Sequence, residues 1–390
     1  MDFDHIVDRS GSNALKLELR ERLFGTHDVL PLWVADMDFP APPGVSRAIQ
    51  ERAAHPLYGY TARDDAFYEA IVNWLKERHA WEVRKEWLEY MPGVVPALIL
   101  AVQAFTKPGE KVVIQPPVYP PFFEVVKDHD RVLEENPLSN SPDGYQMDFA
   151  HLDEITSAPD VKMLLFCHPH NPVGRVWGAE ELQKLSEICL KNNVLVVSDE
   201  IHADLTLYGH KHIPLASLGD QTAANTITLM APSKTFNIAG LNTAYMVASN
   251  REIWKTMHQK LFAYHLHTGN MFGAEALKAA YQNGHKWLDE LLNYIEGNTN
   301  FVLEFLKTHM PEVRAHTPEA TYLIWLDFSA WGMKPVSLQR FIIEKAGLGL
   351  NNGPAFGRQG QGFQRLNVAS PRSIIEEAME KLLKARNQII

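Results

Sequence analysis

The sequence predicts an α/β protein whose sheet is mostly parallel and covered by helices. Strand-like runs rich in Val, Ile and Leu alternate with longer amphipathic segments through the middle of the 390-residue chain. Such continuous apolar runs are typical of parallel strands, because helices bury both faces of the sheet. Polar residues directly follow several of these runs, at the edge where a parallel sheet binds its ligands. This alternation predicts βαβ units.

Five apolar runs are the predicted strands of this sheet. They cover residues 111–115, 162–166, 194–198, 226–229 and 244–248. Between the second and third lies the clearest covering helix, residues 179–192, in which Leu182, Leu185, Ile188 and Cys189 recur at helical spacing. An apolar helix is also predicted over residues 94–105.

The pattern changes after about Gly284. A long amphipathic stretch at 287–308 precedes a strand-like run at 321–327, a helix-like run at 337–346 and an irregular Gly-rich segment at 351–362. We predict a large domain over residues 48–284 and a smaller α+β domain over residues 285–390. The N-terminal segment, residues 1–47, is expected to join the small domain.

Composition excludes several classes of protein. The chain has 46% apolar and 22% charged residues, which is typical of a soluble globular protein. Its net charge of −10 argues against a nucleic-acid surface. No stretch approaches the roughly 18 apolar residues of a membrane helix, and the acidic N-terminus does not resemble a signal peptide. We therefore expect a cytoplasmic protein that binds neither membrane nor nucleic acid, with its two cysteines reduced.

Polar residues follow three of the predicted strands directly. The segment HPHNP at 168–172 follows the second strand, and its prolines fix the turn that carries Asn171. Asp199 follows the third strand, where it either points into a crevice or caps a turn. Lys234 follows the fourth, beside Pro232. Partial desolvation there would lower its pKa and favour Schiff-base chemistry, whereas the alternative is an ordinary surface lysine.

A fourth feature is the helix start at Gly93. Free N–H groups and the positive end of the helix dipole suit a phosphate there, although an ordinary helix start explains the residue equally well. Three His-x-His pairs lack a Cys or carboxylate that would complete a metal site, so no metal is predicted. They are His168/His170, His210/His212 and His265/His267.

In this order and spacing, the four features are the parts needed to hold pyridoxal 5′-phosphate. The lysine would bind the cofactor covalently. The strand-end Asp would pair with the pyridine nitrogen and keep it protonated, so that the ring withdraws electrons from the substrate.

From about Trp33 to Arg372 the chain resembles the fold type I pyridoxal-phosphate enzymes of the aspartate aminotransferase superfamily. It is most similar to their MalY/PatB-like cystathionine β-lyase (C–S lyase) branch. The motifs that carry this resemblance are WVADMDF at 33–39, YGYT at 58–61, NPVGR at 171–175, DEIH at 199–202, SKTFN at 233–237, and the segments 356–357 and 365–369. The resemblance implies a large domain with a seven-stranded sheet, and a homodimer.

The resemblance also implies a role for each site residue. Lys234 would bind the cofactor and move the substrate's protons, Asp199 would hold the pyridine nitrogen, and Asn171 would bind the phenolic oxygen. Tyr119 would stack on the ring, and Arg365 would clamp the substrate carboxylate. The expected phosphate ligands are Gly93, Val94, Val95 and Ser233, with Tyr60 reaching the phosphate in the partner subunit. Trp33 and Asp36 are expected on the substrate side.

Three positions depart from the aminotransferase pattern. Ala231 and Asn242 stand where aminotransferases place phosphate-binding Ser or Thr and Arg, and His202 stands where aspartate aminotransferase has a cofactor-binding Tyr. His202 favours α,β-elimination from cystathionine or a cysteine S-conjugate, to give a thiol, pyruvate and ammonia. Two alternatives remain open: an aminotransferase built from the same parts, and a regulatory protein that binds a transcription factor.

Overall fold

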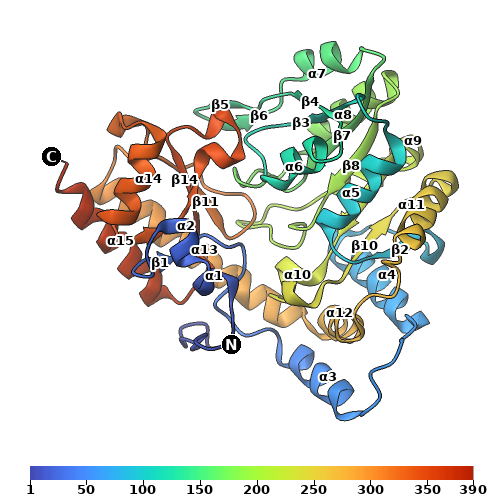
Figure 1. Cartoon of the computed structure of the whole chain (residues 1–390), viewed down its shortest axis with the longest axis horizontal. Coiled ribbons are helices and arrows are strands. Elements are labelled where there is room, and N and C mark those ends of the chain that lie inside the picture. The colour runs from blue at the N-terminus through green and yellow to red at the C-terminus, as the bar shows by residue number, and fades with distance from the viewer. Residues whose placement is uncertain (390) are drawn as a thin grey trace.

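The computed structural model describes residues 1–389, and its largest unit is a seven-stranded sheet (Figure 1). The strand order is β2-β10-β9-β8-β7-β3-β4. The strands are β2 (Leu88–Met91), β3 (Lys111–Ile114), β4 (Val132–Glu135), β7 (Val161–Cys167), β8 (Leu195–Asp199), β9 (Thr226–Met230) and β10 (Ala244–Val247). β10 runs antiparallel to both of its neighbours, β2 and β9, and all other neighbouring strands of the sheet are parallel. The predicted α/β class and mostly parallel sheet are confirmed.

The five predicted strands correspond to β3, β7, β8, β9 and β10. Two strands at the edges of the sheet, β2 and β4, were not predicted. β2 (LEYM) contains the charged Glu89, and β4 (VLEE) ends in two glutamates and is only partly covered, with Val132 43% exposed. Neither therefore shows the long apolar run that marks a central parallel strand.

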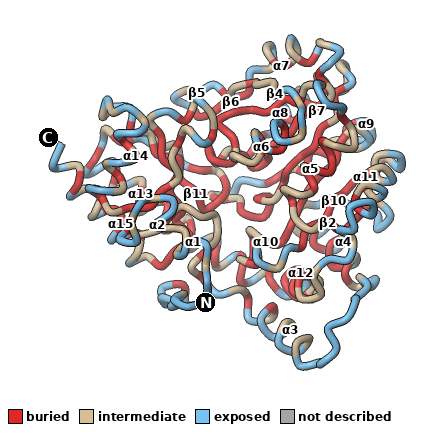
Figure 2. The backbone as a smooth tube through the Cα atoms, viewed as in Figure 1, coloured by how far each residue is buried: buried red, intermediate tan, exposed pale blue. Residues whose placement is uncertain are grey.

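Helices bury both faces of the large sheet (Figure 2). Side chains of α5, α6 and α11 pack on one face in one apolar cluster, and those of α7 and α8 pack on the other. The helices around this sheet are α4 (Asp65–His79), α5 (Val94–Phe105), α6 (Pro121–Lys127), α7 (Phe149–Thr156), α8 (Ala179–Lys191), α9 (Asp220–Ala224), α10 (Pro232–Thr235), α11 (Arg251–Ala263) and α12 (Met271–Asn283).

The C-terminal part forms a three-stranded antiparallel sheet of order β11-β14-β13. Its strands are β11 (Leu323–Asp327), β13 (Asn351–Asn352) and β14 (Phe363–Asn367), with helices α13 (His285–His309), α14 (Pro335–Glu344) and α15 (Arg372–Arg386). The N-terminal elements are α1 (Leu15–Glu18), α2 (Arg20–Phe24) and β1 (Leu30–Pro31), and β1 pairs with β12 (Leu348–Gly349). The division into domains at residues 47 and 284 stays a prediction.

Helix α3 (Pro43–Ala54) and the stretch that follows it project from the body of the molecule (Figure 1). Residues 54–62 are all exposed, as the pale blue trace in Figure 2 shows. Three of them carry large side chains, Leu57, Tyr58 and Tyr60, and Tyr60 is 99% exposed.

Among residues 1–389, no helix is long and apolar enough to span a membrane. No group of three or more His, Cys, Asp or Glu in the same range is arranged to hold a metal ion. Both cysteines are buried and free of disulfide bonds.

Candidate active site

The site is centred on Lys234, in the short helix α10 that follows β9. Its Nζ donates a hydrogen bond to the carbonyl of Ala35, at 2.8 Å. Burial lowers the pKa of Lys234 to about 8, and the positive charge of Arg365 acts in the same direction. Most of this amine is therefore still protonated near physiological pH, but the neutral fraction, the form that makes a Schiff base, is far larger than for an ordinary lysine.

Asp199 ends β8, the strand next to β9, and is buried. Its Oδ1 accepts a hydrogen bond from the N–H of Ile201, at 3.1 Å. Burial raises the pKa of Asp199 to about 7, while Lys234 acts to lower it. A buried carboxylate with this pKa is poised to share a proton with a ring nitrogen.

Asn171 and Arg365 meet although they are 194 residues apart in the sequence. Arg365 on β14 is only 4% exposed, and its Nη1 donates to Asn171 Oδ1 at 3.0 Å. Its Nη2 donates to the Trp33 carbonyl at 3.0 Å and to Asn351 Oδ1 at 2.6 Å, while Nε has no partner. All these partners are neutral. Burial lowers the pKa of Arg365 to about 10, so it stays charged at neutral pH and can pair with a ligand anion.

Residues 33–39, which we call the N-terminal strip, form one wall of the site. The Ala35 carbonyl accepts from Tyr322 as well as from Lys234, and the Val34 and Asp36 carbonyls both accept from Asn367. Asn237 binds the backbone of Met37 and Phe39. The strip is thus held through its backbone, from both the large sheet and the C-terminal part.

The two predicted substrate residues lie in this strip. The Asp36 carboxylate pairs with Arg9 at 2.6 Å, and Trp33 Nε1 donates to the Lys16 carbonyl at 3.2 Å. Asp36 is also close enough to Lys234 and Tyr322 to raise the pKa of each. Asp36 therefore lies near the lysine, but its carboxylate is already engaged by a cation.

His202 and Tyr119 also lie close to the charged groups of the site. His202 is buried, its Nδ1 has no partner, and burial lowers its pKa to about 3, so the ring is neutral. Tyr119 is partly buried, which raises its pKa, and both Arg365 and Asp199 influence it. Both side chains can bind a ligand without adding charge.

Helix α5 begins at Val94, directly after Gly93. The N–H groups of a first helical turn have no partner within the helix, so those of Val94 and Val95 are free for a phosphate. Ser233 lies in α10, next to Lys234. Tyr60, in contrast, is 99% exposed.

Sequence reasoning missed four residues of this site: Asn237, Tyr322, Asn351 and Asn367. Asn237 and Asn367 stand in the motifs SKTFN and 365–369, but no role was assigned to either residue. Their closeness in the sequence to Lys234 and Arg365 could have identified them as site residues. Tyr322 contacts the Ala35 carbonyl of the strip, 287 residues away in the sequence. Asn351 contacts Arg365, 14 residues away.

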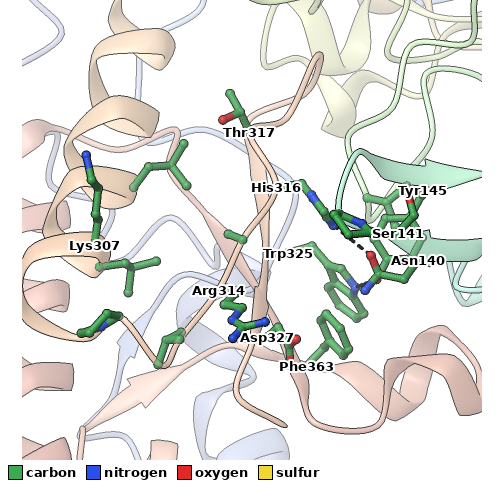
Figure 3. Close-up of a pocket in the computed structure, with 17 residues that line it drawn as sticks. Asn140, Ser141, Tyr145, Lys307, Arg314, His316, Thr317, Trp325, Asp327 and Phe363 are labelled. Atoms are coloured by element: carbon green, nitrogen blue, oxygen red, sulfur yellow. Dashed lines mark hydrogen bonds between the residues drawn. The ribbon is translucent and has the colours of Figure 1, made fainter. Parts of the chain in front are cut away.

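The cavity in Figure 3 is lined by none of the predicted site residues. It has a volume of about 710 Å³ and lies between the hairpin of β5 (Ser139–Ser141) and β6 (Gly144–Gln146), the end of α13 and β11. Its floor includes Trp325 and Phe363, whose rings stack at 5.1 Å. Trp325 also contacts Phe356, over which Arg365 lies at 5.0 Å. This cavity is thus separated from Arg365 by a layer of aromatic rings.

The residues of the site fit pyridoxal phosphate. A partly neutral amine, a strand-end carboxylate and a helix N-terminus match the aldehyde, ring nitrogen and phosphate of the cofactor. The unpartnered His202 Nδ1 and Arg365 Nε, both buried, show that the site has polar atoms left for a ligand.

Comparison with known proteins also indicates a pyridoxal-phosphate enzyme. Residues 27–382 match the family "Aminotransferase class I and II". The chain is 44% identical to cystathionine beta-lyase PatB of Bacillus subtilis, covering 99% of this chain and 100% of PatB. A pyridoxal-phosphate-bound C–S lyase from Staphylococcus hominis superposes with a TM-score of 0.91 at 33% identity, covering 99% of this chain and 98% of the other.

A third relative is a pyridoxal-phosphate-bound putative aminotransferase from Clostridium difficile. It superposes with a TM-score of 0.97 at 44% identity and covers 98% of this chain and 99% of its own. The fold, the lysine-centred site and these similarities all indicate the same family. The chain belongs to the class I and II aminotransferase family of pyridoxal-phosphate enzymes, and within it to the group of cystathionine β-lyases and C–S lyases.

Proposed function

We propose that this enzyme cleaves a carbon–sulfur bond by α,β-elimination, with cystathionine or a related cysteine S-conjugate as substrate. The observation that carries the proposal is the similarity to a cystathionine β-lyase along the whole chain, at 44% identity. The site supports it, because a buried, unneutralised Arg365 faces a partly neutral lysine.

When bound, pyridoxal phosphate supplies an electron-withdrawing ring that makes the α-proton of an amino acid acidic. Arg365 would hold the substrate carboxylate through its fork of N–H groups. Lys234, as the neutral amine, would take the α-proton. Asp199 would keep the ring nitrogen protonated, and Asn171, His202 and Tyr119 would position the ring.

The sulfur leaves the β-carbon as a thiolate, which is a good leaving group because thiol pKa values are low, near 8.5. For cystathionine, one substrate and one water give homocysteine, pyruvate and ammonia. No electrons are gained or lost overall, so no second substrate is needed.

Purified enzyme is therefore expected to release pyruvate, ammonia and a free thiol from cystathionine, catalytically and with no 2-oxo acid added. A coupled pyruvate assay together with a thiol reagent measures both products. If turnover depends on added 2-oxoglutarate, and the cofactor otherwise accumulates in its amine form, the enzyme is an aminotransferase. That alternative is favoured by the description of the Clostridium difficile relative as a putative aminotransferase.

Arg365→Lys is expected to raise the KM for amino-acid substrates at least tenfold and to leave the cofactor bound. Lysine keeps the charge but loses the planar fork, and a lost hydrogen bond to a charged group costs about 1.5–3 kcal/mol. Steady-state kinetics and the visible absorbance of the cofactor measure the two effects. Arg358→Lys, on a side chain that is 76% exposed, is the control. An unchanged KM in the Arg365 variant would remove it from the substrate site.

We also propose that the active unit is a homodimer in which Tyr60 reaches the partner's cofactor phosphate. The proposal is supported by the exposed stretch 54–62, in which Leu57 is 69% exposed and Tyr60 is 99% exposed. Analytical ultracentrifugation is expected to give a dimer, and Tyr60→Phe to weaken cofactor binding about tenfold through loss of one phosphate hydrogen bond. A fully active monomer would refute it.

A further inference from the structure

A second group of buried polar residues lies directly behind Asp199 and Lys234. Alternate residues of a strand point to opposite faces, so Ser198 on β8 points away from Asp199, and its hydroxyl donates to Glu200, which directly follows the strand. The group comprises Glu200, His212 and His168 on one side, and Asp204, His79 and Thr235 on the other, and none has a role in the proposed reaction. Glu200 follows Asp199 in the chain, and Thr235 follows Lys234.

Glu200 and His212 form the first half of the group. Their side chains are fully buried, with His212 Nε2 at 2.7 Å from Glu200 Oε2. Glu200 Oε1 also accepts from the Ser198 hydroxyl at 2.7 Å and the Leu215 N–H at 3.2 Å. Burial raises the pKa of Glu200 and lowers that of His212 well below its usual value. These two groups therefore do not form an ordinary ion pair of two full charges.

Asp204 is the centre of the second half. Its Oδ1 accepts from Trp74 Nε1 at 3.0 Å and lies 2.8 Å from His79 Nε2, and its Oδ2 accepts from the Thr235 hydroxyl at 2.7 Å. Burial would raise the pKa of Asp204, but the hydrogen bonds from His79 and Thr235 outweigh it and lower the pKa. Asp204 is thus a buried carboxylate that holds the residue next to Lys234.

The histidine rings join the two halves. His212 lies 5.4 Å from His79 and 4.3 Å from His168, measured between ring centroids. His168 Nε2 lies 3.0 Å from the Ile213 carbonyl and must donate to it, so that Nδ1 carries no proton in the neutral ring. Burial lowers the pKa of His168 to about 3, which keeps the ring neutral.

We propose that this group is a positioning network, in which Glu200 orients Asp199 through its hydrogen bond to Ser198 and places its carboxylate behind Asp199, while Asp204 fixes Lys234 through Thr235. The inference rests on the use of pyridoxal phosphate and not on the C–S lyase activity. Its physical basis is that each of the two carboxylates is held by three polar partners. Glu200 directly follows Asp199 in the chain, and Asp204 binds Thr235, which directly follows Lys234. A network with only a packing role would stabilise the fold without tuning the cofactor.

Glu200→Gln tests the first half, because it removes a charge with little change of shape. The titration midpoint of the cofactor's visible absorption band is expected to fall by about one pH unit. A shift of about one pH unit corresponds to about 1.4 kcal/mol, the order of magnitude expected when one buried negative charge near the cofactor is removed. The charged and titratable groups facing Glu200 are Asp199, His168, His212 and His79, and none of them is changed.

Glu89→Gln is the matched control, because Glu89 is also a buried Glu paired with a histidine. It lies on β2, with Oε2 at 2.5 Å from His258 Nδ1. Its titration midpoint is expected to match that of the unmodified enzyme. Equal midpoints in both variants, whether shifted or not, would overturn the role of Glu200.

If Glu200→Gln does not fold, Ser198→Ala is the second variant. It removes one hydrogen-bond donor to Glu200 and should lower the midpoint by a smaller amount. An unshifted midpoint in Ser198→Ala would also overturn the role of Glu200.

Thr235→Val and Thr235→Ser test the second half. Valine has the shape of threonine without the hydroxyl, whereas serine keeps it. Hydroxylamine is expected to remove the cofactor's visible band about tenfold faster from Thr235→Val than from the unmodified enzyme, since one hydrogen bond to a charged group is lost. Thr235→Ser should restore the original rate. Equal rates in the two variants would show that the hydroxyl does not position Lys234.

Discussion

Lys234→Ala is expected to abolish catalysis, with a loss of at least about 10⁴-fold, because it removes the group that binds the cofactor covalently and the base that takes the α-proton. The variant should fold normally, since Lys234 makes a single hydrogen bond, to the Ala35 carbonyl. It should also lose the colour of the covalently bound cofactor. Borohydride reduction followed by peptide mapping of the unmodified enzyme should find the cofactor on Lys234.

Lys286→Ala, on a side chain that is 91% exposed, is the control and should keep both activity and colour. The pKa of Lys234, about 8, adds a condition on pH. Below that value the amine is protonated and cannot accept the α-proton, so exchange of the substrate's α-proton with solvent should slow as the pH falls through 8. A cofactor mapped to any other lysine would overturn the assignment of the site.

Asp199→Ala should lower kcat by about 10²–10³-fold or more, with the cofactor still attached to Lys234. Removing one preorganised electrostatic group from an active site typically costs this much, and Asp199 is the one buried carboxylate expected at the ring nitrogen. The measurement is kcat for cystathionine at saturating cofactor. Asp153→Ala, at a partly exposed carboxylate paired with Lys191, serves as the matched control. Near-normal turnover of the Asp199 variant would show that another group protonates the ring.

The residues that follow the strands could be placed from the sequence. Asn171 and Lys234 follow β7 and β9, Asp199 is the last residue of β8, and the structure brings these strands side by side. Because the carboxyl ends of parallel strands meet at one edge, a linear order of motifs becomes a spatial cluster. The apolar runs that mark these strands also predicted the class of the fold.

The contacts of the N-terminal strip could not be placed in this way. The strip presents backbone carbonyls, such as that of Ala35, and every residue type has one. The partners Tyr322 and Asn367 lie on or beside the small antiparallel sheet, whose position relative to the large sheet has no local signal in the sequence. Part of the positioning network was missed for a similar reason, since His79 and Asp204 are 125 residues apart and neither stands in a cofactor motif. Glu200 and Thr235 do stand in such motifs, but the motifs do not indicate their buried partners.

The strip also determines when the enzyme can become complete during synthesis. Trp33 reaches its partner Arg365 across 332 residues, and Val34 reaches Asn367 across 333. Contacts between residues so far apart in the sequence form late in folding, because closing the loop between them costs chain entropy before the contacts that offset this cost are made. On the ribosome, the large sheet can form before residue 365 has emerged, but the wall of the site cannot. A nascent chain that stops short of β14 would thus carry Asp199 and Lys234 in an open, water-filled crevice.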